Sequence, residues 1–249
     1  YYIYALYLGE GVGFIISIYL LISHFKNEFS GGFKIEPDLF KQGFLSQSGH
    51  LIQFFNYRLS YFFILAYLSQ SALGLYATVF VLPDTIWIFG NSIGTVLHMK
   101  VVNKTEKDLT GLTLKYLKMS TMITGVLILI VLIIPAEFWA WLLGNDFIGI
   151  KEIFYWLVPG TLALGISTCI SHYYHAIKKF IVLIWANAIG LIVKVSILIY
   201  FGQSLSLNNV AMASSIGLCA ITLVLILKFY FDSKDIKKAI SLTDGFNKL

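Results

Sequence analysis

The amino-acid sequence predicts an all-α integral membrane protein with about seven transmembrane helices. Of its 249 residues, 58% are hydrophobic and only 12% are charged. The mean hydropathy is +0.80, which lies outside the range expected of a water-soluble domain. The apolar residues form runs of about 20 or more, the length that crosses a bilayer as a helix. Within a run such as 126–134 every residue is apolar, and this lack of alternation favours helices over membrane strands.

The apolar runs and the polar breaks between them predict the helices in order along the chain. The expected spans are 1–24, 42–67, 71–99, 116–143, 150–176, 180–201 and 208–231. Because the chain opens without methionine and already inside an apolar run, we expect it to be the later part of a longer protein. Residues 25–41 are expected to be a cytoplasmic connecting loop, 42–231 to hold the six following spans, and 232–249 to be a cytoplasmic tail.

Lysines are distributed asymmetrically between the connections, and this asymmetry predicts the orientation in the membrane. Fifteen of the 18 basic residues follow the first, third, fifth or last span. They are Lys26, Lys34, Lys41, Lys100, Lys104, Lys107, Lys115, Lys118, Lys178, Lys179, Lys228, Lys234, Lys237, Lys238 and Lys248. The connections at 69–72, 144–149 and 202–209 contain none. Since basic residues accumulate on the cytoplasmic side, we expect residue 1 outside and Leu249 inside the cell.

Composition and motifs argue against several function classes. The net charge of +5 comes from lysines scattered between apolar runs, so we expect no nucleic-acid partner. His172 and His175 have helical spacing for a metal, but no acidic or cysteine partner lies near them in sequence, and we expect no metal site. Because the chain has neither a phosphate-binding loop nor a serine elbow, we expect no catalytic residue, no cofactor and no enzymatic activity.

A few ionisable side chains fall inside the predicted spans, where a charge at the bilayer centre costs roughly 2.5 to 3.5 kcal/mol. They are Glu10, Arg58, Asp84 and Lys194, and His50 also lies within a span. Arg58 and Asp84 occur on consecutive antiparallel helices, so they either form a structural ion pair or line a polar cavity. Lys194 is near enough to the outer end of its helix to reach the lipid headgroups, which is one interpretation of this residue.

The span 42–67 is unusually polar for a membrane helix. Its polar residues occur on more than one face and include Gln42, Ser46, Ser48, His50, Gln53, Asn56 and Ser60. A helix surrounded by lipid would not carry these side chains. We therefore interpret Arg58 as part of the lining of a water-filled path, where its planar guanidinium suits a phosphate group.

Three prolines fall within predicted spans and are candidate hinges. They are Pro83, Pro135 and Pro159. Proline lacks the backbone N–H, and its ring pushes against the carbonyl four residues earlier, so each position is expected to bend or interrupt its helix. The alternative is that these bends only shape the packing, because proline is common in membrane helices.

The order of these features resembles the C-terminal half of bacterial polysaccharide (O-antigen) flippases, within the multidrug/oligosaccharidyl-lipid/polysaccharide exporter superfamily. The segments that carry the resemblance are NYRLSYFFI at 56–64, LGLYA at 73–77, LLGNDF at 142–147, HAIKK at 175–179 and VAMASSIG at 210–217. Each segment is degenerate by itself. Their order and spacing through most of the chain carry the resemblance. It implies that residues 1–24 are the last helix of a preceding N-terminal lobe and that 42–231 form a six-helix transmembrane C-lobe.

The resemblance implies a transporter of the bacterial inner membrane that flips a polyprenyl-diphosphate-linked oligosaccharide, an O-antigen or capsule repeat unit, by alternating access. On this interpretation Arg58, Lys194 and His50 would attract the diphosphate, while Glu10 or Asp84 would bind a coupling ion. The expected partners are the lipid-linked oligosaccharide, membrane lipids, a glycan polymerase and other assembly proteins.

Three other classes of membrane protein are alternatives to the flippase. A drug or cation antiporter of the same superfamily would share the fold but would favour an acidic cavity. A membrane transferase acting on glycans would need a cluster of acids or a His-Asp pair near a membrane face, and the outer connections are too short to hold one. A non-transporting membrane partner in glycan assembly would use its intramembrane charges only for structure.

Overall fold

A computed structural model describes residues 2–25, 37–103 and 108–246 of the chain. All regular elements in these ranges are helices, which confirms the predicted all-α class. The chain divides into two compact units, residues 1–41 and residues 42–249. Each unit is described by itself.

The first unit contains α1, which runs from Tyr2 to Phe25 and carries Glu10 on an exposed position. The loop predicted for 25–41 falls mostly on residues 26–36, outside the described residues. The next helix, α2 (Pro37–Tyr67), begins inside that predicted loop. Proline is well suited to a first helical turn, where its missing N–H is not needed, and Asp38 beside it complements the positive end of the helix dipole.

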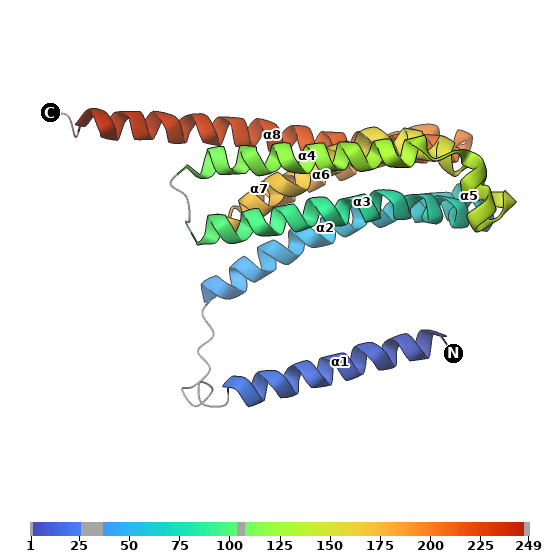
Figure 1. Cartoon of the computed structure of the whole chain (residues 1–249), viewed down its shortest axis with the longest axis horizontal. Coiled ribbons are helices and arrows are strands. Elements are labelled where there is room, and N and C mark those ends of the chain that lie inside the picture. Colours follow the sequence, from blue (N-terminus) through green and yellow to red (C-terminus); the bar gives the residue numbers. More distant parts are fainter. Residues whose placement is uncertain (1, 26–36, 104–107, 247–249) are drawn as a thin grey trace. The chain divides into compact units, whose positions relative to one another are not determined.

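The second unit is a bundle of antiparallel helices (Figure 1). After α2 come α3 (Gln70–Val102), α4 (Leu109–Ile133), the short α5 (Ala136–Leu143), α6 (Ile150–Ala176), α7 (Phe180–Phe201) and α8 (Leu207–Phe246). Helix α6 is central, because it packs against α3, α4 and α8, while α7 packs mainly against α8. Two groups of buried apolar residues form the core, one around Tyr76 and Phe154 and the other around Leu97 and Tyr174.

Small residues let the central helices approach closely, as is common where membrane helices pack. Gly160 of α6 lies against the backbone of Ser215 in α8, so closely that a Cβ atom would overlap it. Gly190 of α7 lies in the same way against the carbonyl of Gly217 in α8. The hydroxyl of Thr222 donates to the carbonyl of Ala163 at 2.8 Å and joins α8 to α6. These contacts fix the bundle that supports α2 and α3.

Five helical segments in the described part of the chain are long and apolar enough to cross a membrane. They are Gln70–Val102, Leu109–Ile133, Asn145–Ala176, Phe180–Ser204 and Leu207–Lys234. The apolar described stretch of α1 is shorter, Tyr7–Leu20, and α2 does not reach the same apolar content. A membrane-embedded protein is therefore supported, whereas the predicted total of seven spans is not confirmed.

Two predicted boundaries need correction. Pro135 does not lie inside a span: α4 ends at Ile133, and Pro135 precedes α5, because proline cannot continue the hydrogen bonding of the helix before it. Helix α8 continues to Phe246, beyond the helix expected at 208–231, while the apolar part of it ends near Lys234 and the cytoplasmic position of 232–249 stays a prediction. Pro83 and Pro159 do lie inside the continuous helices α3 and α6, and their role as moving hinges stays a prediction.

Candidate functional site

A cavity of about 630 Å³ lies in the second unit, between α2, α3 and α6, with α7 and α8 contributing the remaining wall. Four of the protein's five histidines line it. They are His50, His98, His172 and His175, and we call this cavity the histidine pocket. It occupies the half of the bundle that holds the end of α3 and the end of α6, both followed by the lysine-rich connections that predict the cytoplasmic side.

The histidines form two ring pairs that connect three helices. His50 of α2 stacks on His175 of α6, with ring centroids 5.4 Å apart and ring planes 12° from parallel. His98 of α3 meets the ring of His172 of α6 edge-on at 6.2 Å. His172 also places Nε2 3.0 Å from Oδ1 of Asn91 in α3. The histidines therefore hold the polar faces of α2, α3 and α6 around one space.

Aromatic and carboxamide side chains complete the lining. The indole Nε1 of Trp87 donates to the hydroxyl of Thr168 at 3.1 Å, which fixes the ring between α3 and α6. Gln53 donates its amide to the hydroxyl of Tyr57 at 3.2 Å, one turn further along α2. Asn187 of α7 adds a third carboxamide to those of Gln53 and Asn91. The lining thus combines flat apolar rings with groups that can both donate and accept hydrogen bonds.

The half of α2 beyond the pocket is fastened to the rest of the bundle by polar contacts. The amide of Asn56 donates to the carbonyl of Asn187 in α7 at 2.9 Å. The hydroxyls of Ser60 and Tyr76 both meet that of Ser214 in α8, at 3.1 and 3.0 Å. Several residues that made the span 42–67 look too polar for lipid therefore bind neighbouring helices.

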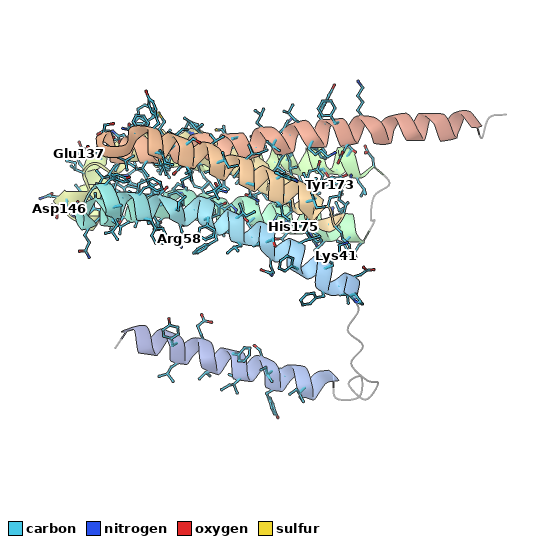
Figure 2. The ribbon with its side chains drawn as sticks, turned by 180° about the vertical axis from the view of Figure 1, so that it is seen from behind. Lys41, Arg58, Glu137, Asp146, Tyr173 and His175 are labelled. Carbon is cyan, nitrogen blue, oxygen red and sulfur yellow. The ribbon has the colours of Figure 1, made fainter. Side chains whose placement is uncertain are left out.

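Arg58 of α2 and Asp84 of α3 are both exposed, and their place in a polar cavity stays a prediction. The Arg58 guanidinium lies over the ring of Tyr61, 5.3 Å from its centroid, and Asp84 is within its electrostatic reach. In the part of the chain that the structure describes, the close ion pairs are those of Asp232 with Lys179 and Lys228. Figure 2 places Arg58 between Asp146, at one end of the bundle, and His175 towards the other.

Lys194 lies in a different environment from the other predicted site residues. Its side chain is only 2% exposed, and its ammonium donates to the backbone carbonyl of Asn56. It does not reach the lipid headgroups, because its face of α7 is turned against α8, where its stem contacts Gly217. A buried cation bound to a carbonyl favours a structural role that joins α7 to α2.

Lys194 therefore provides a test of structural against substrate-binding character. Lys194→Met keeps the volume of the side chain, so we expect the fold to be retained. Lys194→Ala leaves a void between α2, α7 and α8, and we expect a loss of about 2–5 kcal/mol in stability. Thermal unfolding of the purified protein measures the second effect. Loss of cellular activity in Lys194→Met at unchanged stability would instead show that the ammonium has a functional role.

The predicted site residues thus separate into groups. His50 belongs to the histidine pocket, whereas Arg58 and Asp84 share an outer face and Lys194 is buried. Glu10 belongs to the first unit and is exposed there. Among the described residues, no group of three or more His, Cys, Asp or Glu is placed to hold a metal ion.

Most of the histidine pocket was not predicted from the sequence, although a helical period marks it. On α3, Trp87, Asn91 and His98 recur at the spacing of one helix face. On α6, Thr168 and His175 lie two turns apart on the face that also carries His172. Read together, these stripes indicate two polar faces that turn toward each other rather than toward lipid.

Comparison with known proteins gave no further identification: no family model, curated protein or solved structure matches the chain. The resemblance to polysaccharide flippases therefore stays a prediction from the sequence.

Proposed function

We propose that this protein is a membrane transporter, not an enzyme, and that it moves a polyprenyl-diphosphate-linked oligosaccharide across the bacterial inner membrane by alternating access. The observation that carries the proposal is the exposed position of Arg58 on a bundle of membrane-spanning length. The histidine pocket, on the side predicted to be cytoplasmic, adds a space for a solute that is lined by both apolar and hydrogen-bonding side chains.

The exposed position of Arg58 has an energetic cost unless its surroundings are polar. A charged side chain in mid-bilayer is tolerated when it faces protein or water rather than hydrocarbon. Arg58 and Asp84 are both exposed on the surface of the isolated bundle, so their shared face requires a polar surrounding. A path through the membrane that holds water would supply it. The guanidinium would then bind a diphosphate by two parallel charge-assisted hydrogen bonds, while Asp84 remains a candidate for a coupling ion.

Orientation supports the same assignment. The lysine-rich connections predict that the histidine pocket lies near the cytoplasm, where lipid-linked precursors are made, and that the C-terminus is cytoplasmic. At this end Asp232 of α8 binds Lys179 at 3.1 Å and Lys228 at 2.8 Å. Membrane lipids, the lipid-linked glycan and the proteins that polymerise or assemble it are the partners that this function requires.

A drug or cation antiporter is the nearest rival, and the exposed carboxylate of Asp84 favours it. A cationic solute would be expected to meet acidic groups in its binding space. Among the described residues that line the histidine pocket, none is acidic. This composition favours the glycan transporter. A non-transporting role in glycan assembly would leave both the exposed arginine and the polar pocket without a use.

Depletion of the protein in cells that need it for surface glycan tests the proposal. We expect surface glycan to disappear and the complete lipid-linked repeat unit to accumulate with its sugars on the cytoplasmic side of the membrane. Mass spectrometry of extracted lipids identifies the unit, and a membrane-impermeant sugar-oxidising reagent reports its side. Re-expression should reverse both effects. Loss of glycan without accumulation of the precursor would point to a role in synthesis and would contradict transport.

A further inference from the structure

We infer that the histidine pocket binds neutral sugar rings within this single bundle, separate from the face that carries Arg58. The inference rests on the proposed function for the identity of the glycan that delivers those rings. Binding itself depends only on the chemistry of the lining. The pocket would hold the sugar part of the substrate while Arg58 meets its phosphates.

The volume of the histidine pocket suits a small molecule. Pockets that hold small molecules range from roughly 300 to 1,000 Å³, and the histidine pocket measures about 630 Å³. It is also framed by contacts already made within the protein. Trp87 is held by Thr168, and His172 is held by Asn91, so the binding groups are oriented before a ligand arrives.

The lack of charged side chains among the lining residues that the structure describes limits the chemical class of the pocket's ligand. None of the described lining residues is Asp, Glu, Lys or Arg. A cation would find no carboxylate, and a strongly anionic group would find no permanent positive charge. A lipid tail would offer no hydrogen bond to the ring nitrogens of His50 and His175, which is costly where those nitrogens are shielded from water. A neutral polar solute satisfies all of these conditions.

Hydrogen-bonding capacity then points to hydroxyl groups. Imidazole, carboxamide and hydroxyl side chains can each donate or accept hydrogen bonds, as a sugar hydroxyl does. His50, Gln53 and Asn187 bring such groups from two helices. Trp87 and Phe180 add flat apolar surfaces against which the C–H face of a sugar ring can pack. Alternating apolar faces and hydroxyl edges are characteristic of a carbohydrate.

The test uses maltose as a neutral disaccharide probe and the protein expressed at its full natural length in lipid nanodiscs. Purification avoids maltoside detergents, whose headgroups would occupy the site. Saturation-transfer NMR should show direct contact between maltose and the protein, and titration calorimetry should give its affinity. Absence of maltose binding by both methods would overturn the inference.

A matched pair of substitutions locates the binding. Thr95 and Thr85 are both exposed threonines of α3 whose hydroxyls donate to the carbonyl one turn earlier, at 2.9 and 2.8 Å, but only Thr95 is among the pocket's lining residues. Thr95→Phe fills the pocket and should weaken maltose binding about tenfold or more, whereas Thr85→Phe should leave it unchanged. Equal effects of the two substitutions would contradict the assignment.

A second variant removes hydrogen bonds without filling the space. His50→Phe keeps a ring to stack on His175 but has no donor or acceptor, so maltose binding should weaken by about threefold to tenfold. Unchanged affinity in both Thr95→Phe and His50→Phe would place the sugar elsewhere. Maltose binding that Thr95→Phe abolishes, without precursor accumulation on depletion, would support the pocket and overturn transport. Precursor accumulation on depletion without maltose binding would support transport and overturn the sugar-binding assignment of the pocket.

Discussion

Arg58→Ala is expected to lower the proposed transport of the lipid-linked oligosaccharide by about ten- to hundredfold, because a hydrogen bond to a charged group contributes about 1.5–3 kcal/mol. Arg58 is the only arginine in the sequence, so no neighbouring guanidinium replaces it. The measurement is the rate at which surface glycan appears after induction, at equal protein level, together with the amount of precursor that accumulates.

Arg58→Lys is the matched control for charge. A lysine keeps the positive charge but presents no planar fork, so we expect partial transport if a diphosphate binds there. Because Arg58 lies on an exposed face and contacts Tyr61, neither substitution should disturb the buried core. Normal surface glycan in stable Arg58→Ala would show that the arginine is only a structural partner of Asp84.

The positions of the helices could be predicted closely from the sequence, because long apolar runs and the breaks between them are local features. The spans expected at 150–176 and 180–201 coincide with α6 and α7. Predicted helix ends were wrong where a helix ends at a different residue from the apolar run. Helix α8 continues beyond Asp232 because a helix does not end where the apolar run ends, and Pro135 separates two helices that were predicted as one.

The candidate site could be predicted only in part, because it is assembled from different helices. The high cost of an intramembrane charge was enough to single out Arg58 and Asp84. Lys194 was judged by its depth along α7, whereas its contacts depend on the direction in which it points, toward α2 and α8. The pairing of His50 with His175 depends on the relative rotation of α2 and α6, which no local pattern reveals.

Gly160→Ala should produce a large loss of stability for the smallest possible change in side chain. Gly160 lies in α6, the helix that packs against α3, α4 and α8. A Cβ atom at this position would overlap the backbone Cα of Ser215, and backbone cannot turn aside as a flexible side chain can. The helices must separate, which should cost about 1–3 kcal/mol and weaken the bond from Ser215 to the carbonyl of Trp156.

Gly125→Ala in α4 separates this packing effect from the general effect of alanine in a helix. A Cβ atom on Gly125 would have open space around it. Alanine is favoured over glycine within a helix by roughly 0.5–1 kcal/mol, so this variant should be slightly more stable than the natural protein. Thermal unfolding of the two variants in the same nanodiscs should therefore shift in opposite directions. A Gly160→Ala protein as stable as Gly125→Ala would contradict the close approach of α6 and α8 at Gly160. The packing of α6 against α8 would then not be what holds the bundle on which α2 lies.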